Sequence, residues 1–193
     1  MAVFGFTPLA LGVLAACARL SSASSVPEPD SLLGLTLVNI RIEGATSTIY
    51  EGVVATKGHN VTTASGGTHH CDGTNLSANP TPGPTCTSAL DDAAKLTHFA
   101  WDGTYSTTYD DYFVTKIGGS AQTDSQFWGV LLNWHFTSVG GCQQKVATKD
   151  EILWAYDAFN KAHFLKLDGP TTTKVNVPFQ GKYRPPVPLS RLT

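Results

Sequence analysis

The chain carries little charge. Charged residues make up only 15% of its 193 residues, and the formal net charge is -2, whereas an average soluble domain has roughly 25% charged residues. The sequence has no surplus or stripe of Lys and Arg, which nucleic-acid-binding proteins need to neutralise phosphates. Nucleic-acid binding is therefore not expected. Gly, Ser and Thr take the polar positions instead, as they do in many extracellular β-proteins.

Enzyme motifs are also missing. No Gly-x-Ser-x-Gly sequence places a serine nucleophile on a sharp turn, and nothing positions an oxyanion hole for Cys142 or a serine with His135 or His163 as the base. The doublets Asp91-Asp92 and Asp110-Asp111 supply carboxylates, but sequence neighbours point to different faces, so neither is a natural acid–base pair. We predict a non-enzymatic protein without a cofactor, and an uncharacterised hydrolase is a further alternative.

Long hydrophobic runs are absent except at the N-terminus. The segment MAVFGFTPLALGVLAACA has the length of a signal-peptide core, and Ala16-Cys17-Ala18 and Ser21-Ser22-Ala23 both suit signal peptidase. Pro8 interrupts the run and Arg19 ends it, which leaves it short of the roughly 20 residues that span a bilayer. A cleaved signal peptide is therefore expected, and an uncleaved anchor or a lipidated Cys17 are the alternatives.

Changes in composition divide the chain. We predict a signal peptide over 1–23, a linker over 24–34 and one compact domain over 35–169. A Pro-rich, disordered tail follows over 170–193, because so many prolines cannot continue a sheet. No transmembrane segment is expected in the mature chain, and the protein is predicted to be secreted, extracellular, and associated with a cell wall or cell surface.

Four cysteines are present, and Cys17 is lost if the signal is cleaved. Of the other three, we predict a disulfide between Cys71 and Cys86, because the polar, Pro/Gly-rich loop between them has little structure of its own. Closing about 15 residues in this way contributes roughly 3 kcal/mol. Cys142 would then be buried and free, or would pair outside the chain.

Two sequons agree with export. Asn60-Val61-Thr62 and Asn75-Leu76-Ser77 both lack a middle proline and lie in polar stretches. In a eukaryotic secretory pathway such asparagines accept N-linked glycans. We therefore predict a glycoprotein that is modified at Asn60 and Asn75.

Strand patterns and one helix pattern indicate the fold. Residues 36–43 alternate apolar and polar positions, and 48–56 resume β-type composition after a turn, which predicts a hairpin. Residues 57–86 show no periodicity. The segment 86–97 predicts a short helix, with capping-box spacing from Ser88 to Asp91 and an i,i+4 pair of Asp91 and Lys95. Its two aspartates are explained by the preference for acidic residues in the first turn of a helix.

Further strands are predicted at 110–119, 126–136, 151–159 and 162–169, with Trp128, Trp134 and Trp154 in the core. A hairpin, then a helix, then several strands favours an α+β fold. We predict a β-grasp-like mixed sheet with one short helix packed across it. The alternative is an all-β sandwich in which the helix is incidental.

Aromatic residues are the leading candidates for ligand contact. Trp101, Tyr105, Tyr109 and Tyr112 lie in a polar context, WDGTYSTTYDDY, of the kind that stacks on sugar rings and other flat ligands. The alternative is that they fill the core and anchor loops. The expected partner is accordingly a cell-wall glycan or a small molecule.

Histidine and cysteine supply a second candidate. His69, His70 and Cys71, with Cys86 nearby, offer imidazole and thiolate ligands for Zn or Cu. Their spacing fits no zinc signature, and exported cysteine pairs usually oxidise. The leading hypothesis is thus a secreted or cell-surface binding or structural module, and a small extracellular metal-binding protein is the alternative.

Three segments carry a resemblance to a known family. They are VNIRIEG with TIYEG over 38–52, YFVTKIGG leading into WGVLLNW over 112–134, and KDEILWAYDAF over 149–159. In order and spacing they resemble the transcobalamin-like C-terminal domain family, a domain of unknown function in many secreted fungal and bacterial proteins. The resemblance covers about 35–167 and implies the fold and the compartment. THHCDGTN and GGCQQ are similar to its fungal secreted branch.

One position departs from the family pattern. The family often has Gly-Asp before the last strand, where this chain has Lys149-Asp150. A turn that prefers a positive φ would lose its glycine there, which puts the turn geometry in question. The chain has no counterpart of the cobalamin carrier's helical barrel, which normally holds the corrinoid together with the β-domain. The resemblance therefore does not extend to cobalamin binding.

Overall fold

The computed structural model describes residues 34–168 together with Lys182 and Tyr183. The signal peptide predicted over 1–23, the linker up to residue 33 and all but two residues of the predicted tail lie outside the described residues. Cys17 lies outside them as well. These assignments stay predictions.

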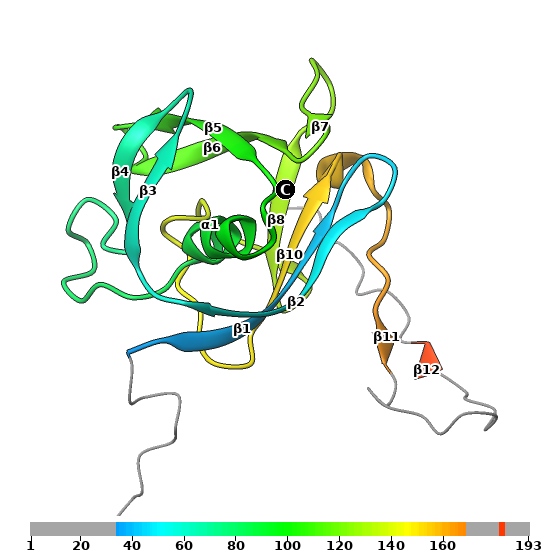
Figure 1. Cartoon of the computed structure of the whole chain (residues 1–193), viewed down its shortest axis with the longest axis horizontal. Coiled ribbons are helices and arrows are strands. Elements are labelled where there is room, and N and C mark those ends of the chain that lie inside the picture. Colours follow the sequence, from blue (N-terminus) through cyan, green and yellow to red (C-terminus); the bar gives the residue numbers. More distant parts are fainter. Residues whose placement is uncertain (1–33, 169–181, 184–193) are drawn as a thin grey trace, which may run out of the picture.

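A five-stranded mixed sheet forms one side of the molecule (Figure 1). Its strands follow the order β2-β1-β10-β8-β9. They are β1 (Thr36–Glu43), β2 (Thr48–Thr56), β8 (Trp128–Leu132), β9 (His135–Phe136) and β10 (Glu151–Tyr156). β1 and β10 are parallel neighbours, and the other neighbours are antiparallel. The central strand pair thus joins the beginning and the end of the described domain.

The hairpin predicted over 36–56 is confirmed as β1 and β2. Its alternation is visible in the burial, because Val38, Ile40 and Ile42 are at most 1% exposed while Asn39 is exposed. Successive side chains of a strand point to opposite faces of the sheet, so one face of β1 packs into the core. The pattern in the sequence was therefore sufficient for this element.

The predicted helix is confirmed as α1 (Cys86–Thr97), but its capping differs from the prediction. Thr85 is the N-cap and forms a capping box with Ser88, so the box is not the one predicted from Ser88 to Asp91. Asp91 and Asp92 consequently lie beyond the first turn, and the first-turn explanation for them is wrong. The i,i+4 ion pair of Asp91 and Lys95 is confirmed.

Two further hairpins complete the ring of strands around α1 (Figure 1). One is β3 (His59–Thr63) with β4 (Gly67–Cys71), and the other is β5 (Trp101–Ser106) with β6 (Asp111–Ile117), which β7 (Ser120–Ala121) extends. The first hairpin lies in the stretch 57–86, where the sequence showed no periodicity. Its strands are only five residues long and rich in Thr and His, so a period of two had too few apolar positions to be visible.

The strand predicted over 126–136 is instead two strands joined by a tight turn. Asn133 and Trp134 have φ values of 50° and 69°, as both central residues of a type I′ hairpin turn require. Trp134 is therefore only partly buried, and its indole N–H donates to Glu151. The core prediction is confirmed for Trp128 and Trp154, which are 5% and 3% exposed.

The end of the domain has little regular structure. A 3-10 helix, η2 (Ala158–Asn160), follows β10 directly. The strand predicted over 162–169 is reduced to β11 (Leu167–Asp168), which pairs with β12 (Lys182–Tyr183) as a separate two-stranded sheet.

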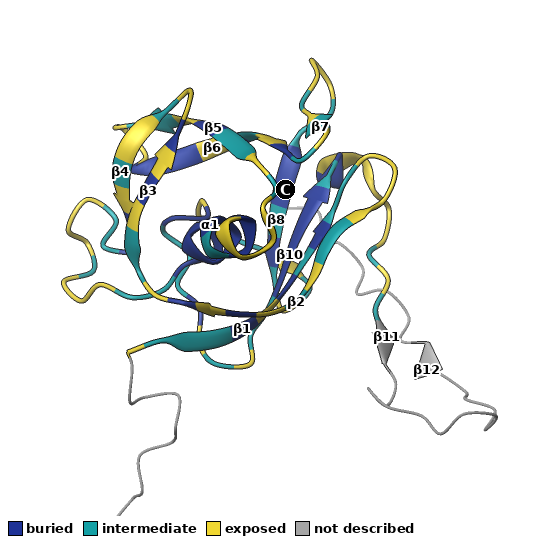
Figure 2. Cartoon of the chain, viewed as in Figure 1, coloured by how far each residue is buried: buried dark blue, intermediate teal, exposed yellow. Residues whose placement is uncertain are grey.

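The main core lies between the sheet and the β5–β6 hairpin, with α1 inside it (Figure 2). Leu90 and Ala93 of α1 are 0% exposed, and Val114 and Ile117 close the core from β6. Lys95 to His98 at the end of α1 are exposed. Because α1 is part of the core, the all-β sandwich with an incidental helix is not the observed fold.

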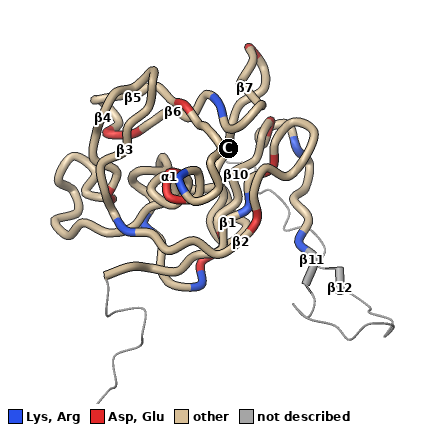
Figure 3. Tube along the Cα trace, viewed as in Figure 1, with Lys and Arg blue, Asp and Glu red and all other residues tan. Residues whose placement is uncertain are grey.

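The described part is thus an α+β domain dominated by β-sheet, with one short α-helix. Acidic and basic residues are scattered along the trace without forming a stripe of one sign (Figure 3). Within the described residues, no helix has the length and apolar character that crossing a membrane would require.

Candidate functional site

Three of the four predicted aromatic residues meet between the two hairpins. Tyr105 of β5 and Tyr112 of β6 are directly opposite each other, and their ring centroids are 5.1 Å apart. Trp101 contacts the edge of Tyr112 at 6.0 Å. His69 of β4 stacks on Tyr105 with a centroid distance of 3.5 Å and an interplanar angle of 2°. The β3–β4 and β5–β6 hairpins therefore pack together through aromatic rings.

Two of these residues are structural. Tyr112 is 4% exposed, and its hydroxyl lies 2.8 Å from the Val61 carbonyl and 2.7 Å from that of Gly67, to which it donates. Burial raises the pKa of Tyr112. Trp101 is partly buried, and its indole N–H donates to Asp91 Oδ1 at 3.1 Å. Tyr112 is therefore closed to a ligand, and Trp101 is fixed in place by its hydrogen bond.

Tyr109 is the most exposed member of the predicted set, and Tyr105, like Trp101, is partly exposed. Tyr105 is partly buried, and Tyr109, in the turn between β5 and β6, is 70% exposed. The Tyr105 hydroxyl donates to Asp110 Oδ1, and burial followed by this hydrogen bond raises the pKa of Tyr105. Of the predicted aromatic residues, Tyr109 offers the largest exposed surface to a ligand.

His70 is held between two carboxylates. Its Nδ1 is 3.1 Å from Asp72 Oδ1, and its Nε2 is 2.8 Å from Asp110 Oδ1. The hydrogen bond to Asp72, opposed by partial burial, raises the pKa of His70. Burial by itself would raise the pKa of Asp110. The hydrogen bonds from the Leu76 amide and the Tyr105 hydroxyl outweigh it, and the pKa of that carboxyl is lowered. In the protonated ring both nitrogens donate to these carboxylates, and neither then has a lone pair for a metal.

The predicted disulfide between Cys71 and Cys86 is wrong. Cys71 is bonded to Cys142, 71 residues away, and Cys86 is a buried free thiol. The loop after Cys71 closes through its own backbone, since the Gly83 amide donates to the Asp72 carbonyl at 2.8 Å. Short separation in sequence was therefore a poor guide to the pairing.

Tertiary contacts bring Cys142 to Cys71. The Gly73 amide donates to the Cys142 carbonyl at 3.0 Å, and Asp111 Oδ1 accepts the Cys142 amide at the same distance. Burial raises the pKa of the Asp111 carboxyl to about 6, against the amide hydrogen bonds that it accepts. Burial also raises the pKa of the Cys86 thiol.

These contacts involve the residues that the sequence offers as metal ligands, and also Cys142, the candidate nucleophile. Cys71 and Cys142 are both oxidised, His69 stacks on Tyr105, and both nitrogens of His70 are paired. The structure therefore does not bring His69, His70 and Cys71 together as ligands of one ion. Cys86 is also separate from them, in the first turn of α1.

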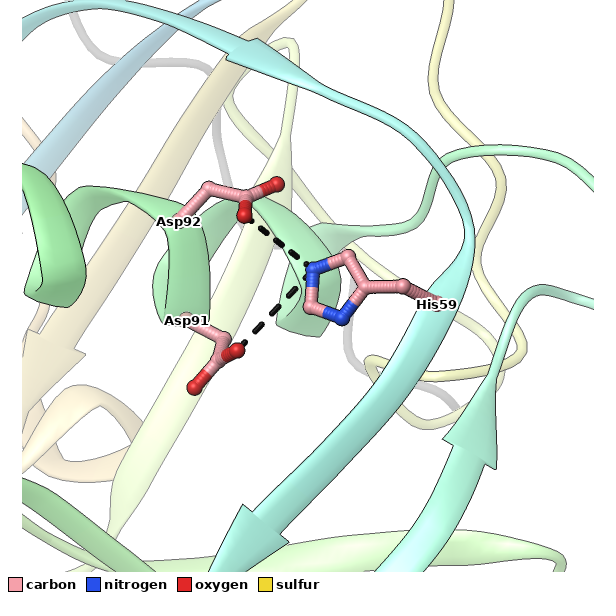
Figure 4. Close-up of side chains that lie close together, drawn as sticks. All are labelled: His59, Asp91 and Asp92. Atoms are coloured by element: carbon pink, nitrogen blue, oxygen red, sulfur yellow. Dashed lines mark ion pairs between the residues drawn. The ribbon is translucent and has the colours of Figure 1, made fainter.

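A different group of potential ligands lies between β3 and α1 (Figure 4). Nε2 of His59, at the start of β3, is 3.2 Å from Asp92 Oδ1 and 3.9 Å from Asp91 Oδ2. Figure 4 shows the imidazole ring pointing at the helix, with one carboxylate on each side. Each of the three side chains offers one donor atom, and these atoms all lie within 4.8 Å of one another, as the ligands of a single metal ion would.

The group is largely buried and its charges are balanced by a lysine. The side chains of Asp91, His59 and Asp92 are 8%, 17% and 22% exposed. Lys95 Nζ is 2.5 Å from Asp91 Oδ2 in an ion pair that lacks good hydrogen-bond geometry. The hydrogen bond to Asp92, opposed by burial, raises the pKa of His59. As it stands, the group is an ion-pair network that fastens β3 to α1.

Sequence reasoning missed this group. The Asp91-Asp92 doublet was set aside because adjacent residues point to different faces, but a single imidazole above the helix reaches both. The burial alternates along β3, with Asn60 and Thr62 exposed, but Val61 is the one apolar residue of this strand, so the sequence carried no visible signal for His59. Only the packing of β3 on α1 makes His59 a neighbour of the aspartates.

The fold and these clusters define the class: a disulfide-containing α+β domain built around one buried helix. Residues 86–158 match a domain of unknown function (DUF4430), a family associated with transcobalamin-like domains. The matched segment begins with α1 and ends just after β10, and it excludes the first two hairpins, so His59, His69 and Cys71 lie outside it. A comparison with curated protein sequences finds no match.

Proposed function

We propose that the chain is a secreted or cell-surface, non-enzymatic binding and structural module with β-grasp topology. The topology is supported by the element order, in which the β1–β2 hairpin is followed by α1 and then by β10, parallel to β1. The match of residues 86–158 to a family associated with transcobalamin-like domains agrees with this assignment.

The observation that carries the extracellular assignment is the disulfide between Cys71 and Cys142. Disulfides form and persist in oxidising compartments and are rare in the cytosol. This bond also joins the THHCDGTN and GGCQQ segments, the two that are similar to the fungal secreted branch. We propose that the chain belongs to that branch. The exposed side chain of Asn60 is compatible with N-glycosylation, and we propose the same modification at Asn75.

The proposed ligand surface is the exposed end of the aromatic cluster. Tyr105 is made rigid by its stack on His69 and by its hydrogen bond to Asp110. Tyr109, which precedes Asp110 in the chain, is exposed. A rigid aromatic ring offers contact area at low entropic cost. We propose a cell-wall glycan as the ligand.

The test measures retention of the purified secreted protein on insoluble cell-wall polysaccharides. Wild type is expected to bind one of chitin, β-glucan or cellulose, and Tyr109→Ala is expected to weaken binding at least about tenfold, because an aromatic anchor carries much of the contact energy. Phe113→Ala is the matched control, since Phe113 is also aromatic and 50% exposed but lies on β6. No retention, or equal losses in both variants, would remove the glycan surface from the proposal.

Two other measurements test the remaining parts. Intact mass with and without reduction and deglycosylation should give one intramolecular disulfide, glycan occupancy and the cleavage site. A chain that is retained inside the cells with Cys71 and Cys142 reduced would contradict the extracellular assignment. Turnover on a hydrolase or oxidase panel that His135→Ala abolishes would contradict the non-enzymatic assignment.

A further inference from the structure

We propose that His59, Asp91 and Asp92 bind a single Zn²⁺ ion between β3 and α1. This site is independent of the glycan surface proposed above, because none of its three ligands belongs to that surface. It also lies partly outside the segment that matches the family, since His59 precedes residue 86.

The distances from His59 Nε2 to the two carboxylates are close to those of a zinc site, and all three donor atoms lie within 4.8 Å of one another. Zinc–ligand bonds of about 2.0–2.1 Å in a tetrahedron place neighbouring ligand atoms about 3.3 Å apart. His59 Nε2 is 3.2 Å from Asp92 Oδ1 and 3.9 Å from Asp91 Oδ2. A rotation of the Asp91 carboxylate toward His59 would shorten the longer of these two distances.

The second nitrogen of His59 supports the same assignment. Nδ1 is 2.9 Å from the Asn60 carbonyl, which can only accept a hydrogen bond, so Nδ1 carries the proton in the neutral ring. The lone pair of the neutral imidazole is then on Nε2, the atom that faces both aspartates. Histidines that bind metals are commonly oriented by such a hydrogen bond from their other nitrogen.

Asp91 is oriented in a similar way. The Trp101 indole donates to its Oδ1, which leaves Oδ2 directed at the space that it shares with His59 and Lys95. Lys95 occupies that space now, but its side chain is 63% exposed and its long flexible stem can move into solvent. A divalent ion would therefore replace the ammonium group as the partner of the buried carboxylate.

The donor set favours zinc over the hard cations. Ca²⁺ takes 6 to 8 oxygen ligands, and Mg²⁺ requires near-octahedral oxygen geometry, whereas this group offers three protein donors, one of them imidazole nitrogen. Three protein ligands leave a fourth zinc position for water or for a ligand from outside. The partial exposure of His59 and Asp92 gives that position a route to solvent.

The experiment is isothermal titration of the tag-free secreted protein with ZnCl₂ at pH 7.5. Binding of one equivalent is expected, and His59→Gln and Asp92→Asn should each weaken it at least about tenfold. His135→Gln is the matched control, because His135 is exposed and is not part of the group. Far-UV circular dichroism establishes that each variant is folded. Failure of wild type to bind Zn²⁺, or equal binding by His59→Gln, would overturn the proposal.

Lys95→Ala gives a second test that does not depend on loss of function. Removing the competing positive charge should make Zn²⁺ bind about tenfold more tightly. A purely structural ion-pair network predicts no such gain. Unchanged Zn²⁺ affinity in this variant, or tighter binding of Ca²⁺ than of Zn²⁺ by wild type, would contradict the assignment. Failure of these tests leaves the proposed secretion and glycan binding unaffected.

Discussion

At the scale of single residues, the least expected backbone feature is the number of side chains in the left-handed region. Lys149 has a φ of 75° in the turn before β10, the position at which the resembling family often has glycine. A side chain in this region costs about 1–2 kcal/mol relative to the right-handed region because of Cβ crowding. Lys149 thus adopts the positive φ that a glycine would favour at this position. Its amide donates to the Leu37 carbonyl.

We predict that Lys149→Gly stabilises the protein by about 0.5–1 kcal/mol. Relief of the Cβ crowding outweighs the extra backbone entropy that glycine brings to the unfolded chain. Lys149 is exposed, so little packing is lost. Urea unfolding of both proteins measures the difference. Lys149→Ala, which keeps the Cβ atom, is the control and should give no gain; a gain of equal size there would refute the backbone explanation.

At the scale of elements, the disulfide and its surrounding hydrogen bonds hold a long connection in place. The segment that contains Cys142 joins β9 to β10, and it contacts the end of β4 through the disulfide. The Thr87 amide also donates to the Gly141 carbonyl at 3.1 Å, which ties the segment to the first turn of α1. Three elements that are distant in the sequence thus share one anchor.

Replacing both disulfide cysteines by alanine should cost about 4 kcal/mol of unfolding free energy, given a closed loop of 71 residues in the chain-entropy description. The measurement is guanidinium unfolding without reductant. Cys86→Ala tests the pairing, because it removes only a buried thiol and should leave the disulfide intact. If Cys86→Ala were as destabilising as Cys142→Ala and released a free thiol at Cys71, the pairing of Cys71 with Cys142 would be refuted.

At the scale of the whole molecule, the titratable groups whose pKa values are shifted favour an acidic medium. The pKa of Asp111 is raised from 3.8 to about 6, and those of His59 and His70 are raised above 6.5. Each of these groups stabilises the fold when protonated, and that contribution is lost as the pH rises through its folded pKa. The pKa values of Asp72 and Asp110 are lowered below 3.8, so their contribution is lost as the pH falls.

The resulting prediction is a maximum of thermal stability at about pH 4, because Asp72 and Asp110 contribute fully above 3.8 while the contribution of Asp111 falls from there to about pH 6. Differential scanning calorimetry from pH 3 to pH 9 measures the melting temperature across this range. In Asp111→Asn the fall in stability between pH 4 and pH 6 should be reduced, while the fall above 6.5 due to the histidines should persist. A melting temperature that is higher at pH 8 than at pH 5 in wild type would contradict the prediction.

The local elements were determined by the sequence itself. The alternation in 36–43 gave β1, and the composition of 86–97 gave α1 with its Asp91–Lys95 pair. Each depends on contacts among near neighbours in the chain or on a single apolar face, and such patterns are written directly in the order of residues. The mixed sheet with one helix followed from the order of these elements.

Other features were decided only by tertiary structure, because they join residues that are distant in the sequence. The bond between Cys71 and Cys142 depends on how the β9–β10 connection packs against β4, and no spacing rule contains that information. The meeting of His59 with Asp91 and Asp92 depends on β3 crossing α1. Which side chain faces which across such a contact is determined by packing, and local sequence patterns do not record it.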